Sequence, residues 1–326
     1  MFEDAPLFIR SFLSYKLTIQ NRSELTVREY WLDLRTFFRY IVLTHEGKDP
    51  DSDVMPDISG YDISLAASVD TADIYSFLLY LAESRRDKPA TRARKLAAIR
   101  AFYKYHTSKS HELKEDPSKD IDSPAIKRRL PKYLSLEEAE QLLDSVDPAS
   151  ENAERDECML TLLLNCGMRL SELTGINLSD ISPDLSRLTV TGKGSKQRTI
   201  YLNDACRSAV GRYINVRGQA ATRHGGTVKD KNALFLSGRY TRISNKTVQW
   251  IVKRQLDKCG LGAKGYSVHK LRHTAATLMY DKGGVDVRVL KEILGHEQLN
   301  TTQIYTHVSD RQLEEAMDKN PLSKRI

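Results

Sequence analysis

The stretch LTVTGKGSKQRTIYL, residues 188–202, decides the fold of this chain. Two short runs rich in β-branched residues, 188–191 and 197–202, flank the glycine-rich segment GKGSK, a pattern typical of two strands joined by a tight turn. Lys193 lies at the tip of this predicted hairpin. Because apolar residues elsewhere recur at helical spacing, we expect a mainly α fold with one small β-hairpin.

Helical patterns surround the hairpin. Ser135, followed three residues later by Glu138, is a capping-box start for a helix that continues through Leu143. A second helix is expected over 155–165, with the apolar run CMLTLLLN at its centre. Further helices are predicted at 204–217, 244–259, 269–282, 285–294, 301–306 and 310–319. Together these elements predict a domain over 131–326.

The first third of the chain is predicted to be a separate helical domain, residues 1–112. Apolar spacing indicates two helices between residues 6 and 45, and two more over 68–84 and 91–106. Asp70 and Thr91 are the expected N-caps of the last two. Residues 113–130 are rich in Lys, Ser, Asp and Pro without sustained periodicity, which favours an interdomain linker.

Composition narrows the class of protein. The 326 residues are 40% hydrophobic, and 50 Lys and Arg against 43 Asp and Glu give a net charge of +7, which favours a polyanionic partner. No apolar run approaches the roughly 18 residues of a membrane span, and the first residues, MFEDAPLFIRSF, lack the bases of a signal peptide. The four cysteines form no CxxC pair, which favours buried free thiols. We expect a soluble cytoplasmic protein.

The positive charge is concentrated in one region. Residues 84–133 hold 15 Lys and Arg against six acids, whereas 46–73 hold eight acids against one lysine. We expect the acidic segment to be a solvated loop facing away from DNA. The predicted helix 91–106 and the hairpin carry the candidate DNA contacts: Arg92, Arg94, Lys95, Arg100, Lys104, Lys196 and Arg198. For the helix, a merely solvated basic face is the alternative.

The segment HKLRH, residues 269–273, brings two imidazoles and a guanidinium to the start of one predicted helix. His269, Arg272 and His273 fall at i, i+3 and i+4 and so share a face. A zinc site is disfavoured, because position 270 is Lys rather than the Glu of HExxH and Arg272 would place a cation beside the metal. With Leu271 and Leu278 around it, His273 is expected to be a buried, hydrogen-bonded core residue.

Other groups along the chain fit a site that cleaves a phosphodiester. In GMRLSEL, Arg169 and Glu172 are three apart, so on a helix the carboxylate can hold the guanidinium in place. His296 follows in LGH and Tyr305 in TTQIYTHV. Each has an ordinary structural interpretation, such as a surface ion pair or a half-buried tyrosine. In combination they supply cations for phosphate oxygens, a proton donor and a hydroxyl nucleophile. A phosphate-binding loop for ATP is not supported, because GxxxxGK[ST] is absent.

The segments GMRLSEL, TGKGSKQR, HKLRHTAATLMY, LKEILGH and TTQIYTHV closely resemble those of tyrosine recombinases of the phage-integrase type, and the last is especially similar to the Xer subgroup. The resemblance implies a helical, SAM-like core-binding domain and a catalytic domain that form a C-shaped clamp on DNA. It implies Tyr305 as nucleophile, Arg169 and Arg272 as phosphate clamps and Lys193 as general acid. His269 would assist proton transfer, His296 would hydrogen-bond the phosphate, and Glu172 would support Arg169.

The resemblance also implies a reaction and partners. Tyr305 would form a 3′-phosphotyrosyl link, and strands would exchange through a Holliday junction without metal, ATP or another cofactor. We expect a homotetramer on two double-stranded sites, or a heterotetramer with a second recombinase, with a DNA translocase as a possible activator. Xer-like resolution of chromosome dimers is favoured. The alternatives are an integrase of a mobile element, a type IB topoisomerase and a DNA-binding regulator without activity. The C-terminal residues 310–326 are expected to form a helix that docks on a neighbouring protomer or on its own domain.

Overall fold

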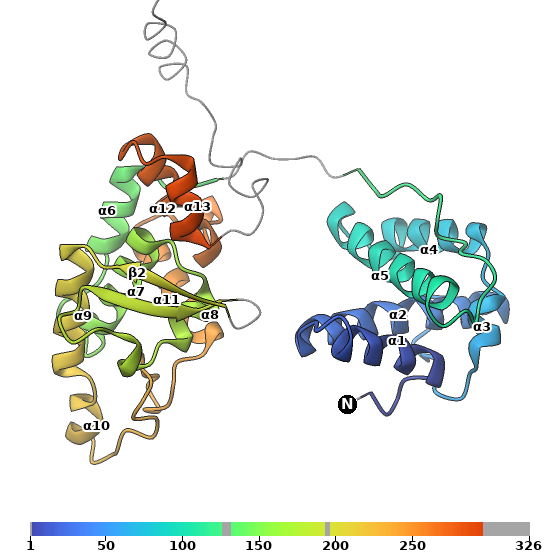
Figure 1. Cartoon of the computed structure of the whole chain (residues 1–326), viewed down its shortest axis with the longest axis horizontal. Coiled ribbons are helices and arrows are strands. Elements are labelled where there is room, and N and C mark those ends of the chain that lie inside the picture. The colour runs from blue at the N-terminus through green and yellow to red at the C-terminus, as the bar shows by residue number, and fades with distance from the viewer. Residues whose placement is uncertain (1, 126–131, 193–195, 296–326) are drawn as a thin grey trace, which may run out of the picture. The chain divides into compact units, whose positions relative to one another are not determined.

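The computed structural model describes residues 2–125, 132–192 and 196–295 (Figure 1). The chain divides into two compact units between Arg129 and Leu130. Each unit has its own hydrophobic core. The predicted helices at 301–306 and 310–319 lie outside the described residues. None of the helices in the described part of the chain combines the length and apolarity that a membrane span needs.

The first unit is all helical. It contains α1 (Leu7–Thr18), α2 (Glu24–His45), α3 (Ile63–Ala67), α4 (Thr71–Glu83) and α5 (Pro89–Ser108). Aromatic side chains from α1, α2 and α5 fill its centre, where the ring centroids of Phe8 and Phe38 lie 5.4 Å apart and those of Phe38 and Phe102 lie 5.3 Å apart. Both pairs meet edge to face, the geometry that aromatic quadrupoles prefer. The helical character predicted for this part of the chain is confirmed.

The helix starts of this unit confirm one predicted cap and correct another. Asp70 caps α4 in a capping box with Asp73, as expected. Thr91 is not an N-cap, because α5 begins at Pro89 with Lys88 as its N-cap residue. Proline suits the first helical position, since its φ is already helical and the N–H that it lacks would have no partner there.

Two segments predicted as loops contribute to the core of the first unit. Within the acidic segment, α3 forms behind the cap residue Asp62, and Ile58 and Leu65 are buried. In the predicted linker, Leu113 and Ile121 are also buried against the core. The structured part of the first unit therefore continues well past residue 112.

The second unit is mostly helical around one hairpin. Its helices are α6 (Leu136–Asp144), α7 (Ala153–Cys166), α8 (Leu170–Gly175), α9 (Asp204–Val216), α10 (Gln219–Arg223), α11 (Asn245–Lys258), α12 (Val268–Asp281) and α13 (Val287–Leu294), with 3₁₀ turns at Leu178–Asp180 and Gly262–Lys264. The strands β1 (Arg187–Thr191) and β2 (Gln197–Tyr201) pair antiparallel with Val190 opposite Arg198. The predicted hairpin and the Ser135–Glu138 capping box are confirmed.

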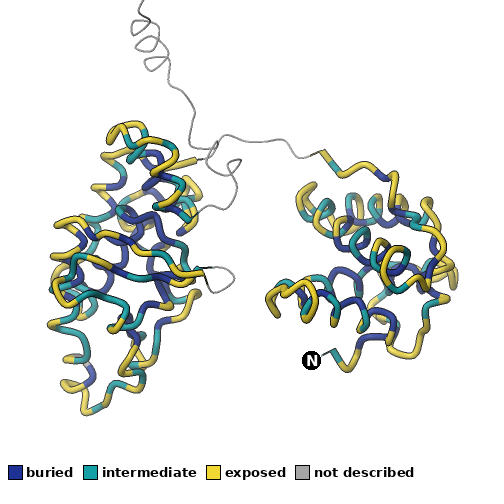
Figure 2. Tube along the Cα trace, in the orientation of Figure 1, coloured by how far each residue is buried: buried dark blue, intermediate teal, exposed yellow. Residues whose placement is uncertain are grey.

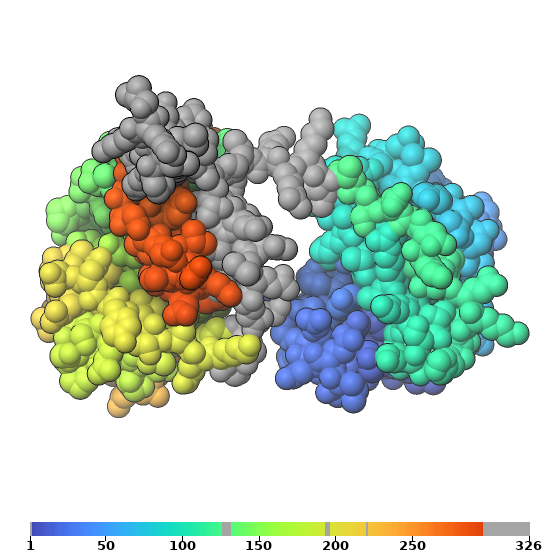
Figure 3. Space-filling model, turned by 45° about the horizontal axis from the view of Figure 1, so that its top comes forward, coloured from blue at the N-terminus to red at the C-terminus, as the bar shows by residue number. Residues whose placement is uncertain are grey.

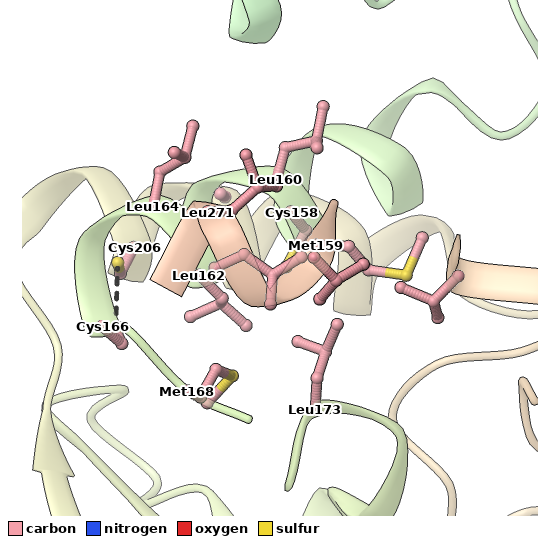
Figure 4. Packing of buried hydrophobic residues seen from close by; sticks show 14 of the residues in the cluster. Cys158, Met159, Leu160, Leu162, Leu164, Cys166, Met168, Leu173, Cys206 and Leu271 are labelled. Carbon is pink, nitrogen blue, oxygen red and sulfur yellow. Dashed lines mark hydrogen bonds between the residues drawn. The ribbon is translucent and has the colours of Figure 1, made fainter. Parts of the chain in front are cut away.

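Helix α7 is the central element of the second unit. It is buried around most of its circumference and packs against α9, α12, α6 and α8 (Figure 2). An apolar run on all sides of a helix is expected where the helix lies inside a domain. Leu162, Met168 and Leu173 lie close together in this core (Figure 4). The core therefore fixes the chain on both sides of Arg169.

The cysteines are free thiols, and three of the four are buried. Cys166 at the end of α7 and Cys206 on α9 lie with their sulfurs 3.7 Å apart (Figure 4). Cys259 is half-buried rather than fully buried. The predicted burial of free thiols is thus confirmed for Cys158, Cys166 and Cys206.

Candidate active site

Arg169 and Glu172 form the start of α8. Helix α7 ends at Cys166, and its C-cap residue Gly167 has a left-handed φ of 56°. The chain then turns so that Arg169 is the N-cap residue of α8. The Glu172 carboxylate accepts hydrogen bonds from the Arg169 backbone N–H at 2.7 Å and from Arg169 Nη1 at 2.8 Å. The expected pairing is present, although Arg169 precedes the helix instead of lying on its face. The Glu172 side chain has no exposed area, whereas that of Arg169 is 36% exposed.

Arg272 reaches the same place from α12. Its Nη1 donates to the Gly167 carbonyl at 2.5 Å and lies 4.0 Å from Glu172 Oε2. Its Nη2 donates to the Leu294 carbonyl at 2.6 Å. The structure therefore brings together Arg169 and Arg272, which are about a hundred residues apart in sequence. Two guanidiniums placed this close together can each donate hydrogen bonds to different oxygens of the same phosphate.

The hairpin supplies a third guanidinium, from Arg198. Arg198 Nη2 lies 3.0 Å from Glu172 Oε2, and the side chain is only 15% exposed. Arg198 and Ile200 share the inward face of β2, and Arg198 also lines the pocket, so its contact with DNA stays a prediction. Lys196 is exposed and lines the same pocket, and its contact with DNA stays a prediction.

Lys193 lies outside the described residues, but the strands that carry it end at the arginine cluster. A Cβ on Gly192 would lie 3.4 Å from Glu172 Oε1 and 3.7 Å from Arg169 Nη1. Lys193 follows Gly192 directly in the sequence. Gly192, the last described residue after β1, therefore lies next to the Arg169–Glu172 pair.

The C-terminal end of α13 is held by all three arginines. The carbonyls of Ile293, Leu294 and Gly295 accept hydrogen bonds from Arg198 Nε at 3.3 Å, Arg272 Nη2 at 2.6 Å and Arg169 Nη2 at 2.9 Å, respectively. These carbonyls lack helical partners, and the negative end of the helix dipole favours cations there. Helix α13 lies at the surface of the second unit (Figure 3). The predicted site residues His296 and Tyr305 follow Gly295 and lie outside the described residues.

His269 and His273 contact each other on α12. Their Nε2 atoms lie 3.0 Å apart, so one ring must donate and the other accept. Partial desolvation and then the nearby Arg272 lower the pKa of His269. Burial lowers the pKa of His273 to about 4, with His269 and Arg272 adding to the effect. The predicted hydrogen bonding of His273 is confirmed by its contact with His269, but the residue is half-buried, which corrects its prediction as a core residue. Both lowered pKa values favour the uncharged form of the imidazole at neutral pH.

The charges at this site do not balance. Three guanidiniums surround the single carboxylate of Glu172, so the four groups together carry two positive charges. They line a pocket of about 910 Å³ to which His269 and Lys196 also contribute. An anion with several oxygens, such as a phosphodiester, fits this excess of charge. Among the described residues, no group of His, Cys, Asp and Glu side chains is arranged to hold a metal ion.

Five polar residues of the pocket were not predicted as site residues from the sequence: Ser171, Gln197, Asn245, Gln249 and Ser267. Asn245 and Gln249 are four apart at the start of α11, so they share a face of that helix. The cap residue Ser244 and the spacing of four predict that Asn245 and Gln249 lie on one face at the start of a helix. Nothing in the sequence indicates that this face lines the pocket. Amide side chains at the rim of a cationic pocket can hydrogen-bond either phosphates or base edges.

The predicted DNA contacts of the first unit all lie on α5: Arg92, Arg94, Lys95, Arg100 and Lys104. Arg94 and Lys95 face α2, where they pair with Asp33 at 2.5 and 3.5 Å. Arg100 donates to the Ser118 carbonyl, which ties down the segment after α5. Lys104 is exposed and Arg92 is half-buried. The structure therefore gives Arg94, Lys95 and Arg100 partners within the unit, and their DNA contacts remain predictions.

Comparison with known proteins identifies the family. Residues 132–312 match the phage integrase family. A tyrosine recombinase XerC of Caldanaerobacter subterraneus subsp. tengcongensis is 48% identical over 98% of this chain and 88% of its own length. The chain belongs to the phage integrase family of tyrosine recombinases. The family predicted from the sequence motifs is thus confirmed, and with it the class of enzyme.

Other relatives of this tyrosine recombinase agree. A tyrosine recombinase XerC of Corynebacterium glutamicum is 38% identical over 80% of this chain and 84% of its own length. The structure of the XerH site-specific recombinase bound to a palindromic difH substrate superposes with a TM-score of 0.72 at 22% identity, over 96% of this chain and 94% of that one. At that identity the likeness concerns the fold, and it confirms the mainly helical class with a small antiparallel hairpin.

Proposed function

We propose that this recombinase cuts and rejoins duplex DNA at a specific site with Tyr305 as the nucleophile. The observation that carries the proposal is the cluster of Arg169, Arg198 and Arg272 around Glu172, because it lies where the chain enters the segment of His296 and Tyr305. In this proposal Arg169 and Arg272 bind the non-bridging oxygens of the scissile phosphate. Their charge stabilises the additional negative charge of the pentacoordinate transition state.

The remaining residues move protons. The Tyr305 hydroxyl, whose ordinary pKa is about 10, attacks the phosphorus, and neutral His269 assists by accepting a proton. Lys193 protonates the 5′-oxygen as the bond between phosphorus and that oxygen breaks. His296 donates a hydrogen bond to the phosphate. The products are a 3′-phosphotyrosyl link and a free 5′-hydroxyl, and attack by a second 5′-hydroxyl reverses the step and restores the phosphodiester.

The biological role proposed here is Xer-like resolution of chromosome dimers in the cytoplasm. The support is the identity to two proteins named tyrosine recombinase XerC over most of their length. In this role four protomers, of this chain alone or with a second recombinase, hold two DNA sites and exchange strands through a Holliday junction. The helical unit and the catalytic unit then contact the duplex together as a clamp.

Covalent trapping tests the chemistry. A duplex with a nick next to the scissile phosphate loses its leaving strand after cleavage, so the protein–DNA link accumulates and is seen by denaturing electrophoresis. We expect such a species with the wild-type chain and none with Tyr305→Phe, at equal DNA binding. No covalent species with wild type on a site that it binds, or an undiminished one with Tyr305→Phe, would contradict the proposal.

Salt dependence tests the clamp. If both units neutralise phosphates, log Kd should rise linearly with log salt, with a slope of about 0.9 per phosphate contact. Lys104→Gln on α5 should lower that slope by about one contact, and the control Lys258→Gln at the far end of α11 should leave it unchanged. Equal slopes for wild type and Lys104→Gln would remove this α5 contact from the proposal.

A further inference from the structure

Arg198 is a basic residue in the hairpin whose side chain is only 15% exposed. It lies on β2 beside the hairpin turn, on the inward face that it shares with Ile200. Burial lowers the pKa of the Arg198 guanidinium, and the negative charge of the nearby Glu172 carboxylate partly offsets that effect. Burying a charged side chain costs stability unless an ion pair and hydrogen bonds offset the loss of water.

The guanidinium of Arg198 connects two other elements. Nη2 bonds to Glu172 Oε2 on α8 at 3.0 Å, and Nε donates to the Ile293 carbonyl at the end of α13 at 3.3 Å. The side chain also packs against the end of that helix, since a Cβ on Gly295 would lie 3.1 Å from Arg198 Cδ. Arg198 thus joins the hairpin to the residue that holds Arg169 and to the residue that precedes His296.

The third nitrogen, Nη1, is buried and has no hydrogen-bond partner in the described part of the chain. It is closed off from water, so a phosphate could reach it only if the surrounding atoms moved. Arg169 differs in this respect, because its side chain is 36% exposed at the pocket. Arg169 is therefore the more accessible of these two side chains to a phosphate in the pocket.

We infer that Arg198 is a positioning residue for strand cleavage. It holds the Glu172 carboxylate against Arg169 and fixes the end of α13. Arg169 and the point where the chain leads into His296 then keep fixed positions relative to each other. This inference rests on the proposed function. A displacement of the reacting groups by about 1 Å can reduce the rate of an enzyme about a hundredfold, so loss of this tether should affect cleavage while DNA binding stays nearly normal.

The test compares three variants with the wild-type chain. Arg198→Met keeps the aliphatic part of the side chain and removes the guanidinium. Arg198→Lys keeps the positive charge but lacks the planar guanidinium that bonds both Glu172 and the Ile293 carbonyl. Arg187→Met is the matched control, because Arg187 lies in the same hairpin on β1 with an exposed side chain. Single-turnover formation of the covalent species is measured on the nicked duplex at saturating protein, together with Kd for the uncleaved duplex and the thermal midpoint.

We expect Arg198→Met to form the covalent species between about tenfold and about a hundredfold more slowly, with Kd within about twofold of wild type. Arg198→Lys should recover part of the rate, and Arg187→Met should match wild type. Cleavage by Arg198→Met at the wild-type rate would overturn the inference. So would a rise in Kd that accounts for the whole loss, because Arg198 would then be a DNA contact.

A double-mutant cycle separates positioning from general destabilisation. If Arg198 acts through Glu172, Arg198→Met combined with Glu172→Gln should be no slower than the slower single variant. Multiplied defects would overturn the inference, and the cycle can be run from Arg198→Lys if Arg198→Met does not fold. Failure of the proposed function looks different, because wild type itself would then form no covalent species.

Discussion

In each unit a buried carboxylate lies among cations, and the arrangements around Asp33 and around Glu172 differ in net charge. In the first unit Asp33 pairs with Arg94 and Lys95, and Arg94 also pairs with Glu29, so two cations meet two carboxylates. In the second unit Glu172 alone faces three guanidiniums. The first arrangement is balanced and needs no further ligand. The second arrangement has an excess of two positive charges, and it lines a pocket. We interpret this excess as the mark of an anion-binding site rather than of a structural ion pair.

The partners of the two carboxylates also differ in their access to water. The Arg94 side chain is 47% exposed and can be solvated if Asp33 is lost. Arg272 and Arg198 are 4% and 15% exposed, so their charges depend on Glu172. Burial raises the pKa of Asp33, while Lys95 and Arg94 oppose that rise. Removing the two carboxylates should therefore have unequal consequences.

The largest effect is expected from Glu172→Ala. It leaves buried guanidiniums without a counter-charge, and breaking such a pair costs about 3–5 kcal/mol. Asp33→Ala should cost less, because Arg94 can turn toward water. Urea unfolding of the full chain, followed by probes in each unit, measures both free energies. Equal losses, or a larger loss for Asp33→Ala, would contradict the distinction between the two sites.

A smaller effect is expected from alanine at the helix ends of the two units. Gly47 after α2 and Gly167 after α7 both have a left-handed φ, which costs alanine roughly 1–2 kcal/mol. A Cβ on Gly47 meets nothing within 4 Å, whereas on Gly167 it would lie 2.8 Å from Leu294 Cδ2. Gly167→Ala should therefore cost more and should also slow covalent cleavage, because it displaces the end of α13.

Gly47→Ala serves as the control for this prediction. It carries the same backbone strain in the unit without the arginine cluster, so its cleavage rate should equal that of wild type. The free energies of unfolding and the single-turnover rates of both variants make the comparison. A cleavage defect in Gly47→Ala of the same size as in Gly167→Ala would show that backbone strain alone explains the effect.

The sequence predicts local secondary structure in this protein better than it predicts which side chains contact each other. The hairpin was predictable because β-branched runs flank a glycine-rich turn, and the α6 capping box because its residues are three apart. The role of Arg198 was not, since its partner Glu172 is 26 residues away and only the fold brings the two together. Thr91 and Pro89 show the limit for boundaries, because two good helix starts lie within one turn. His273 was assigned to the core from its apolar neighbours, but the period of the helix turns it toward His269.

The smallest effect is expected in the pH dependence of stability. The pKa of His273 is lowered from 6.5 to about 4 in the folded chain, so the unfolded chain binds more protons between those values. Stability contributed by neutral His273 is therefore lost as the pH falls from about 6.5 toward about 4. The raised pKa of Asp33 has the opposite sign, and its contribution is lost as the pH rises through the folded value. His273→Gln should flatten the acid side of the stability profile and Asp33→Asn should steepen it, as measured by urea midpoints at successive pH values. Parallel profiles for wild type and His273→Gln would show that the imidazole pair of α12 does not titrate in this range.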